Sequence, residues 1–224
     1  KYSRDGVSYT DASNSLLFSI TYTMQDPILA LSEKAGAVAD KNGNQIYIFD
    51  QTQAKGQIKT LLPIKHIAIS NQGVVAVLME ESSAAKLEVY SSEGTLLGDG
   101  VFSLDDAGYP MNLSISSDGT KIAIASSSAD PKQFTIYGLT WSDAGVPTLS
   151  REIVITHGIG TYVYDIAWDL AGNIYICGNS GEYLKGFSLP RNEAFTTKAP
   201  SQYSFSVIAN SIDAISVNND ENAP

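Results

Sequence analysis

A pattern of four short strands that recurs along the chain is the feature that most constrains the fold. In its clearest copy, Ile67–Ser70 alternates large apolar with small residues, Asn71–Gly73 is turn-forming, and Val74–Met79 is almost continuously apolar. Leu87–Tyr90 then alternates again, and Thr95–Phe102 supplies a fourth strand after another turn. Period-two alternation bounded by turn residues predicts strands, because side chains of a strand point to opposite faces in turn. The unit is therefore an antiparallel meander of four strands.

Repeats of roughly 36 to 50 residues with four strands each are typical of β-propeller blades, as in WD40-like proteins. Helical repeats of similar length need apolar residues at positions i, i+3 and i+4, and these segments lack that spacing. The four predicted blades cover residues 27–62, 63–104, 109–156 and 162–207.

The two ends of the chain supply the parts of a further blade. Residues 7–12 and 16–22 resemble third and fourth strands, and residues 212–217 resemble a first strand. We therefore predict an all-β fold, with one β-propeller domain over residues 1–224 and about five blades. Its last blade combines residues 1–24 with 210–218, so that the N- and C-terminal strands close the ring and remove the exposed strand edges.

Some alternatives stay open at this point. Residues 1–4 are the only candidates for a second strand of that blade, so either the blade is incomplete or the native protein is longer. A β-sandwich and an open run of blades are the alternative folds. The chain starts at Lys1 without an initiator Met or signal peptide, and we expect it to be trimmed from a longer protein.

Composition excludes several classes of partner. The net charge is −10 with 14 Lys and Arg, and no basic cluster occurs, so we predict no nucleic-acid binding. No stretch reaches the about 18 consecutive apolar residues of a membrane span, so we predict no membrane segment. The single Cys177 cannot form an internal disulfide.

Candidate ligand-binding residues gather on one predicted face. The loops that join a fourth strand to the next first strand, and a second to a third, open on the same side of a propeller, where concave sites usually lie. We call this side the loop face. The candidates in these loops are Asp26, His66, Asp105, Asp106, Tyr109, His157, Tyr162 and Tyr164.

The residue types on this face favour binding without catalysis, with a glycan or a protein as ligand. Tyrosines offer apolar platforms, while Asp, Asn and Gln side chains offer hydrogen bonds. The alternative is a glycoside hydrolase or lyase that uses carboxylates of the loop face, and such hydrolases need a pair of carboxylates. The candidate acids are Asp26, Asp105, Asp106 and Asp165, and their spacing singles out no pair.

The metal-binding patterns in the chain are incomplete. His66, His157 and Asp26 are residue types that suit zinc, but no HxH or HExxH spacing supports such a site. Residues 40–44 begin like a calcium loop and lack its later glutamate, so a type I′ hairpin turn at Asn42-Gly43 explains them better. We therefore predict no metal and no cofactor.

Two segments of the chain resemble known groups of proteins. Through Ser3–Tyr9, Tyr22–Ile28 and Gln45–Asp50, the first ~125 residues resemble an uncharacterised family of bacterial membrane-anchored propeller-like proteins. This resemblance implies an extracytoplasmic setting and carries no assigned activity.

The last ~60 residues are similar instead to secreted propeller-type proteins of anaerobic gut bacteria, through residues 178–183, 195–201 and 211–217. In those proteins a further segment follows the position of Pro224, which implies that this chain is truncated. Either the chain is a fusion of two parent proteins, or the similarity is the general one between blades of different propeller proteins. Both resemblances imply repeated blades and export, so we expect a secreted or surface-anchored protein.

Overall fold

The computed structural model describes residues 1–81, 83–104, 109–126, 133–156, 163–168, 173–178, 183–188 and 193–198. These residues form β-strands joined by short turns, arranged as one three-stranded and four four-stranded antiparallel sheets. The predicted all-β class and the predicted four-stranded meander are confirmed. No helix in the described part of the chain is both long and apolar enough to cross a membrane.

Each four-stranded sheet is a meander in which the strands pair in chain order. We call the sheets blades 1 to 4. Blade 1 contains β4 (Pro27–Leu31), β5 (Ala35–Asp40), β6 (Gln45–Asp50) and β7 (Ala54–Lys59), and blade 2 contains β8 (Ile64–Ile69), β9 (Val75–Glu81), β10 (Ala84–Tyr90) and β11 (Leu96–Ser103). Blade 3 contains β12 (Pro110–Ile115), β13 (Lys121–Ser126), β14 (Gln133–Trp141) and β15 (Pro147–Thr156), and blade 4 contains β16 (Val163–Trp168), β17 (Asn173–Gly178), β18 (Tyr183–Ser188) and β19 (Glu193–Lys198).

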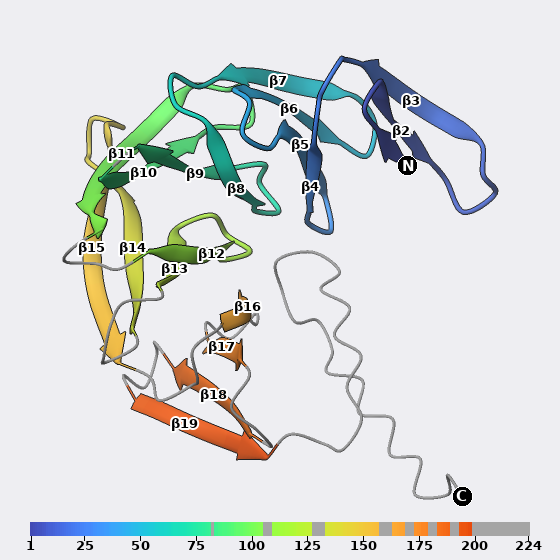
Figure 1. Ribbon diagram of the computed structural model, residues 1–224. Coiled ribbons are helices and arrows are strands. Elements are labelled where there is room, and N and C mark those ends of the chain that lie inside the picture. The colour runs from blue at the N-terminus through green and yellow to red at the C-terminus, as the bar shows by residue number, and fades with distance from the viewer. Residues whose placement is uncertain are drawn as a thin grey trace, which may run out of the picture.

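The blades follow one another along an arc (Figure 1). The first strand of each blade lies toward the centre of the arc and the fourth strand lies at its outside. The inner strands contact one another in succession, β4 with β8, β8 with β12, and β12 with β16. This radial arrangement of sheets is that of propeller blades.

Both faces of blade 2 are buried, which explains its almost continuous apolar second strand. Alternate residues of β9 point to opposite faces, so Val77 and Met79 pack toward blade 1 while Leu78 packs toward blade 3. Burying an Ile, Leu or Val side chain fully contributes about 1.5–3 kcal/mol. The cluster between blades 1 and 2 includes Ala37, Ile46, Ile48, Ile64, Val77 and Met79, and that between blades 2 and 3 includes Leu78, Leu87, Val89, Leu113, Ile115 and Ile122.

The three-stranded sheet at the N-terminus has features of the later strands of a blade. It contains β1 (Tyr2–Ser3), β2 (Gly6–Thr10) and β3 (Leu16–Thr21). The β2–β3 pair shifts register between Tyr9 and Thr10, and the third and fourth strands of blades 1, 2 and 3 shift at the corresponding place. Residues 212–217, which we expect to complete this sheet, lie outside the described residues.

The described hairpins after third strands, in the N-terminal sheet and blades 1 to 3, share a second feature, an acidic or hydroxyl side chain that caps the turn. The Asp11 carboxylate accepts hydrogen bonds from the backbone N–H groups of Ser13 and Ser15 (2.8 and 2.9 Å). In blade 1 the Asp50 carboxylate accepts them from Thr52 and Gln53 (2.7 and 2.9 Å). This shared cap supports the likeness between the N-terminal sheet and the outer part of a blade.

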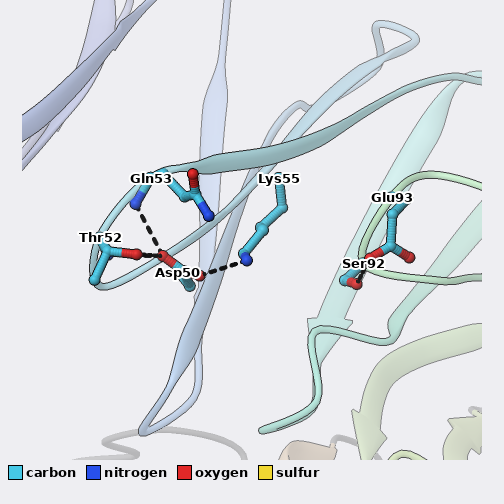
Figure 2. Close-up of polar contacts among 6 residues, drawn as sticks. All are labelled: Asp50, Thr52, Gln53, Lys55, Ser92 and Glu93. Atoms are coloured by element: carbon cyan, nitrogen blue, oxygen red, sulfur yellow. Dashed lines mark hydrogen bonds and ion pairs between the residues drawn. The ribbon is translucent and has the colours of Figure 1, made fainter.

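Figure 2 shows the Asp50 cap beside the next blade. Lys55 Nζ lies 2.9 Å from the second Asp50 oxygen. Burial alone would raise the pKa of Asp50, but the hydrogen bonds from Lys55, Thr52 and Gln53 outweigh it and hold this pKa well below its usual range. A Cβ atom on Gly56 would lie 2.6 Å from the backbone of Glu93, so only a glycine allows blades 1 and 2 to approach this closely.

Backbone and side-chain hydrogen bonds also join neighbouring blades on the side opposite the loop face. Ser32 Oγ donates to the Ser70 carbonyl oxygen (3.0 Å), which links the first turns of blades 1 and 2. The Asn71 N–H donates to the Ser117 carbonyl oxygen (3.0 Å), which links those of blades 2 and 3. These bonds join neighbouring blades directly on this side of the arc.

Candidate functional site

The loop face carries a cavity of about 320 Å³ where blades 1, 2 and 3 meet. Blade 1 contributes its β5–β6 loop, blade 2 the start of β8 and the end of β9, and blade 3 the residues at the start of β12 (Figure 1). The lining residues are Lys41, Asn42, Lys65, His66, Leu78, Met79, Glu80, Tyr109 and Pro110.

The β5–β6 loop has a conformation that places Asn42 against blade 2. The Gly43 N–H donates to the Asp40 carbonyl oxygen (3.0 Å), and Asn42 has a φ of 61°, which asparagine tolerates better than most residues. The Asn42 N–H donates to the Ile64 carbonyl oxygen (2.7 Å), and the Ile64 N–H donates to that of Gly43 (2.9 Å). The predicted type I′ turn at Asn42-Gly43 is wrong. The strands end at Asp40 and resume at Gln45, so the loop has four residues, and its hydrogen bonds to β8 shape it.

A β-bulge at the start of β8 brings two successive side chains to the cavity. Ile64 pairs with Met79 and His66 pairs with Leu78, so Lys65 is an extra residue without a partner in the ladder. Neighbouring residues of a regular strand point to opposite faces, whereas a bulge changes the direction of a side chain. Lys65 and His66 therefore both line the cavity.

This bulge recurs in the two blades that follow. The register shifts between Pro110 and Asn112 in β12 and between Val163 and Asp165 in β16. The extra residue in β16 is Tyr164, one of the predicted site residues. The inner strands of blades 2, 3 and 4 thus share one backbone irregularity at the loop face.

A network of charge-assisted hydrogen bonds spans the cavity. Lys65 Nζ donates to Asn42 Oδ1 (3.0 Å) and lies 3.1 Å from Glu80 Oε2. The Tyr109 hydroxyl donates to the same Glu80 oxygen (2.6 Å). The Tyr109 hydrogen bond and the Lys65 ammonium outweigh burial and lower the pKa of Glu80, while this hydrogen bond raises the pKa of Tyr109. At neutral pH Glu80 is therefore a carboxylate held by groups from two blades.

His66 is neutral at pH 7. Burial lowers its pKa, and the positive charges of Lys41 and Lys65 lower it further. Within the described part of the chain, neither the His66 imidazole nor the Lys41 ammonium has a hydrogen-bond or ion-pair partner. The cavity therefore contains donors that are free to bind a ligand.

The structure brings together two of the predicted site residues, His66 and Tyr109. Asp26 is exposed on the same face outside the cavity, where its N–H donates to Asp40 Oδ1 (2.9 Å). Tyr164 lies in β16, and no described contact bears on its predicted role. Asp105, Asp106, His157 and Tyr162 lie outside the described residues.

Four polar lining residues were missed by sequence reasoning, namely Lys41, Asn42, Lys65 and Glu80. Each stands in or beside a loop of the loop face, so position along the repeat was the signal that could have found them. Among the described residues, no three His, Cys, Asp or Glu side chains gather closely enough to hold a metal ion.

Solved structures of low sequence identity share this architecture. The WD40 domain of SCAP from fission yeast aligns with 77% of this chain and 44% of its own, at 15% identity and a TM-score of 0.55. A protein from Lactobacillus plantarum aligns with 87% of this chain and 65% of its own, at 14% identity and a TM-score of 0.53. A chain of the nidogen/laminin complex aligns with 83% of this chain and 67% of its own, at 14% identity and a TM-score of 0.52.

These similarities show the fold alone, and they confirm that the four-stranded sheets match those of propeller structures. The chain spans less than two thirds of the length of the first two proteins. No curated protein matches the sequence.

Two family matches cover most of the chain. Residues 150–184 match a β-propeller repeat. Residues 1–137, more than half of the chain, match a family of unknown function, DUF5711. These matches confirm the expected likeness of the N-terminal region to an uncharacterised family and of the C-terminal region to propeller proteins. The chain is therefore a β-propeller protein that belongs to the DUF5711 family.

Proposed function

We propose that this protein is a non-catalytic, extracytoplasmic binding module that holds a glycan in the cavity of the loop face. The observation that carries the proposal is the combination of a half-exposed aromatic ring and free hydrogen-bond donors in one cavity. Tyr109 is 44% exposed and offers a ring face, while Lys41 and His66 offer N–H groups. Sugars have apolar C–H faces and many hydroxyl groups, so they suit a site of this composition.

The described carboxylate in the cavity argues for binding rather than hydrolysis. A glycosidase needs two carboxyl groups about 5 to 9.5 Å apart, one of them able to donate a proton. Glu80 is the single carboxylate among the described lining residues, and its lowered pKa keeps it ionised and unable to act as the acid. It serves instead to position Lys65 and Tyr109.

The extracytoplasmic setting rests on the resemblance of the chain to membrane-anchored and secreted propeller proteins. A protein ligand is the other candidate, and one structural neighbour comes from a complex of two proteins, nidogen and laminin. The cavity favours the glycan, because it is a small, partly open site of about 320 Å³ and a protein partner needs a wide surface.

We also propose that residues 212–217 complete the N-terminal sheet as its innermost strand, giving five blades. The three described strands of that sheet and its shared register shift support this closure. Hydrogen exchange tests it, since ladder amides of residues 212–217 should be protected to a similar degree as those of β4. Exchange of these amides at the rate of an unfolded peptide would refute the closure.

The binding proposal is tested with a glycan array followed by calorimetry on the tightest ligand. Tyr109→Ala should weaken binding at least about tenfold, or about 1.4 kcal/mol, because it removes the platform. Tyr2→Ala is the matched control, since Tyr2 is 48% exposed and lies in β1 away from the cavity. Equal binding by the two variants, or no glycan bound at all, would reject the proposal.

A further inference from the structure

We propose that the glycan residue held in this cavity carries a carboxylate, as a uronic acid does. This inference rests on the proposed function and names its ligand class. It follows from three properties of the cavity, namely its free donors, its charge and its apolar wall.

The free groups of the described lining are mostly hydrogen-bond donors, with one acceptor nitrogen on the neutral His66 ring, and they come from two blades. The Lys41 ammonium has no partner among the described residues, and Asn42 uses its Oδ1 to accept from Lys65, which leaves its amide N–H groups without a described partner. His66 adds a ring N–H from β8. The carboxylate of Glu80, in contrast, is already engaged by two donors. A ligand group that accepts several hydrogen bonds at once complements these donors best.

The described lining residues of the cavity carry a net charge of the opposite sign to that of the whole protein. Lys41 and Lys65 are cations, Glu80 is an anion and His66 is neutral, which leaves one net positive charge among the described lining residues. The chain as a whole carries −10. Because the Lys65 charge is balanced by Glu80 at 3.1 Å, Lys41 is the cation available to a ligand. An anionic group is therefore attracted to this cavity although the protein around it is acidic.

The wall of the cavity suits a sugar ring beside that anionic group. The Tyr109 ring and Pro110 follow one another in blade 3 and provide an apolar surface. The hydrogen bond from its hydroxyl to Glu80 fixes the Tyr109 side chain, so less conformational entropy is lost on binding. A volume of about 320 Å³ lies at the lower end of small-molecule pockets, about 300–1,000 Å³. The cavity therefore has room for one residue of a glycan and not for a long stretch of it.

The test compares each carboxylated oligosaccharide with its methyl ester, which keeps the ring and removes the charge. An array should carry galacturonate, glucuronate and sialic acid oligosaccharides beside their esters, with neutral glycans and an acidic peptide. We expect a carboxylated sugar to bind at least about tenfold more tightly than its ester at low salt. This preference should shrink at about 1 M NaCl, where charges are screened beyond roughly 3 Å.

Two lysine variants identify the group responsible. Lys41→Ala should reduce the preference for the acid over the ester to less than about twofold, because it weakens binding of the acid more than binding of the ester. Lys34→Ala is the matched control, because Lys34 is an exposed lysine in the β4–β5 turn of the same blade, on the side opposite the loop face. It should leave the preference unchanged.

Different results would overturn the carboxylate inference and the glycan-binding function. Equal binding of acids, esters and neutral glycans, with loss in Tyr109→Ala, would overturn the carboxylate inference and leave the proposed function intact. The same holds if Lys41→Ala keeps the full preference. Binding of the acidic peptide alone, or of no ligand on the array, would overturn the glycan-binding function together with this inference.

Discussion

Replacing Gly36 with alanine should destabilise the protein, chiefly through a steric clash with the buried Phe49 ring. Gly36 lies in β5 directly opposite Phe49 of β6, and a Cβ atom on it would lie 2.4 Å from Cε2 and Cζ of that ring. The ring is 2% exposed and belongs to the cluster that joins blade 1 to the N-terminal sheet. Phe18 of β3 packs on it with ring centroids 5.8 Å apart. The Phe49 ring therefore cannot move aside without disturbing its neighbours.

The size of the effect follows from this overlap. Carbon atoms in contact lie about 3.5–4.0 Å apart, so the ring or the strand must move by roughly 1 Å or more. Overpacking a filled core costs about 1–3 kcal/mol, and each kcal/mol shifts the melting temperature of a domain of this length by about 2–4 °C. Gly100→Ala is the matched control in β11, because its Cβ atom would lie 3.9 Å from Tyr137, an ordinary contact. The two alanine variants should thus differ by about 2 to 12 °C.

Urea denaturation and thermal melting of both variants measure this difference. Adding Phe49→Leu to Gly36→Ala should recover part of the loss, with a coupling energy of at least about 0.5 kcal/mol, because the ring that the new methyl group meets is gone. Equal stability of the Gly36→Ala and Gly100→Ala variants, or strictly additive effects of Gly36→Ala and Phe49→Leu, would refute the packing described for this sheet.

Three further predictions concern buried and partly buried charges. The lowered pKa of His66 means that the unfolded chain takes up a proton more readily than the folded one, so stability should fall as the pH drops from about 6.5. Urea denaturation at pH 7 and pH 5 should show this loss in the wild type and not in His66→Gln, and parallel curves would contradict it. Glu88→Gln leaves Lys86, 2.7 Å away, without its nearest anion. We expect this variant to lose about 1–2 kcal/mol of unfolding free energy, less than the 3–5 kcal/mol of fully buried pairs, because the Lys86 side chain is 26% exposed. A loss under about 0.5 kcal/mol in urea denaturation would count against this expectation. The lowered pKa of Asp50 stabilises the fold above about pH 4, and this contribution is lost as the pH falls through the folded value. Asp50→Asn should therefore melt below the wild type at pH 7 and approach it at pH 2, and an equal difference at both pH values would be inconsistent with this account.

The strands and their turns were predictable because local chemistry specifies them. Gly73, Gly94 and Gly119 each follow polar turn residues, and each has a positive φ (80°, 87° and 74°) that glycine adopts without strain. The loop after β5 was not predictable in the same way. Asn42 adopts a positive φ as an isolated hairpin turn would require, but hydrogen bonds to Ile64 in the next blade decide the loop's shape. Contacts of this kind do not show in a sequence window.

The sequence could predict which face of the fold carries the candidate site, but not which side chains line the cavity. His66 and Tyr109 share a cavity because the order of strands puts their loops on one side. Lys65 reaches that cavity because of the bulge at the start of β8, and period-two alternation would have placed it on the other face of the strand. Glu80 becomes part of the site through its bonds to Lys65 and Tyr109, which depend on that bulge and on the packing of blade 3.

Histidine-selective NMR tests most directly the claim that this cavity binds a carboxylated sugar. The chain contains two histidines, so the spectrum of the imidazole Cε1–H groups has two signals, and the His66 signal is the one that disappears in His66→Gln. Titration with the tightest carboxylated oligosaccharide should shift the His66 signal to saturation, and the methyl ester should shift it less at equal concentration. A His66 signal that stays in place while calorimetry reports full binding would contradict the account.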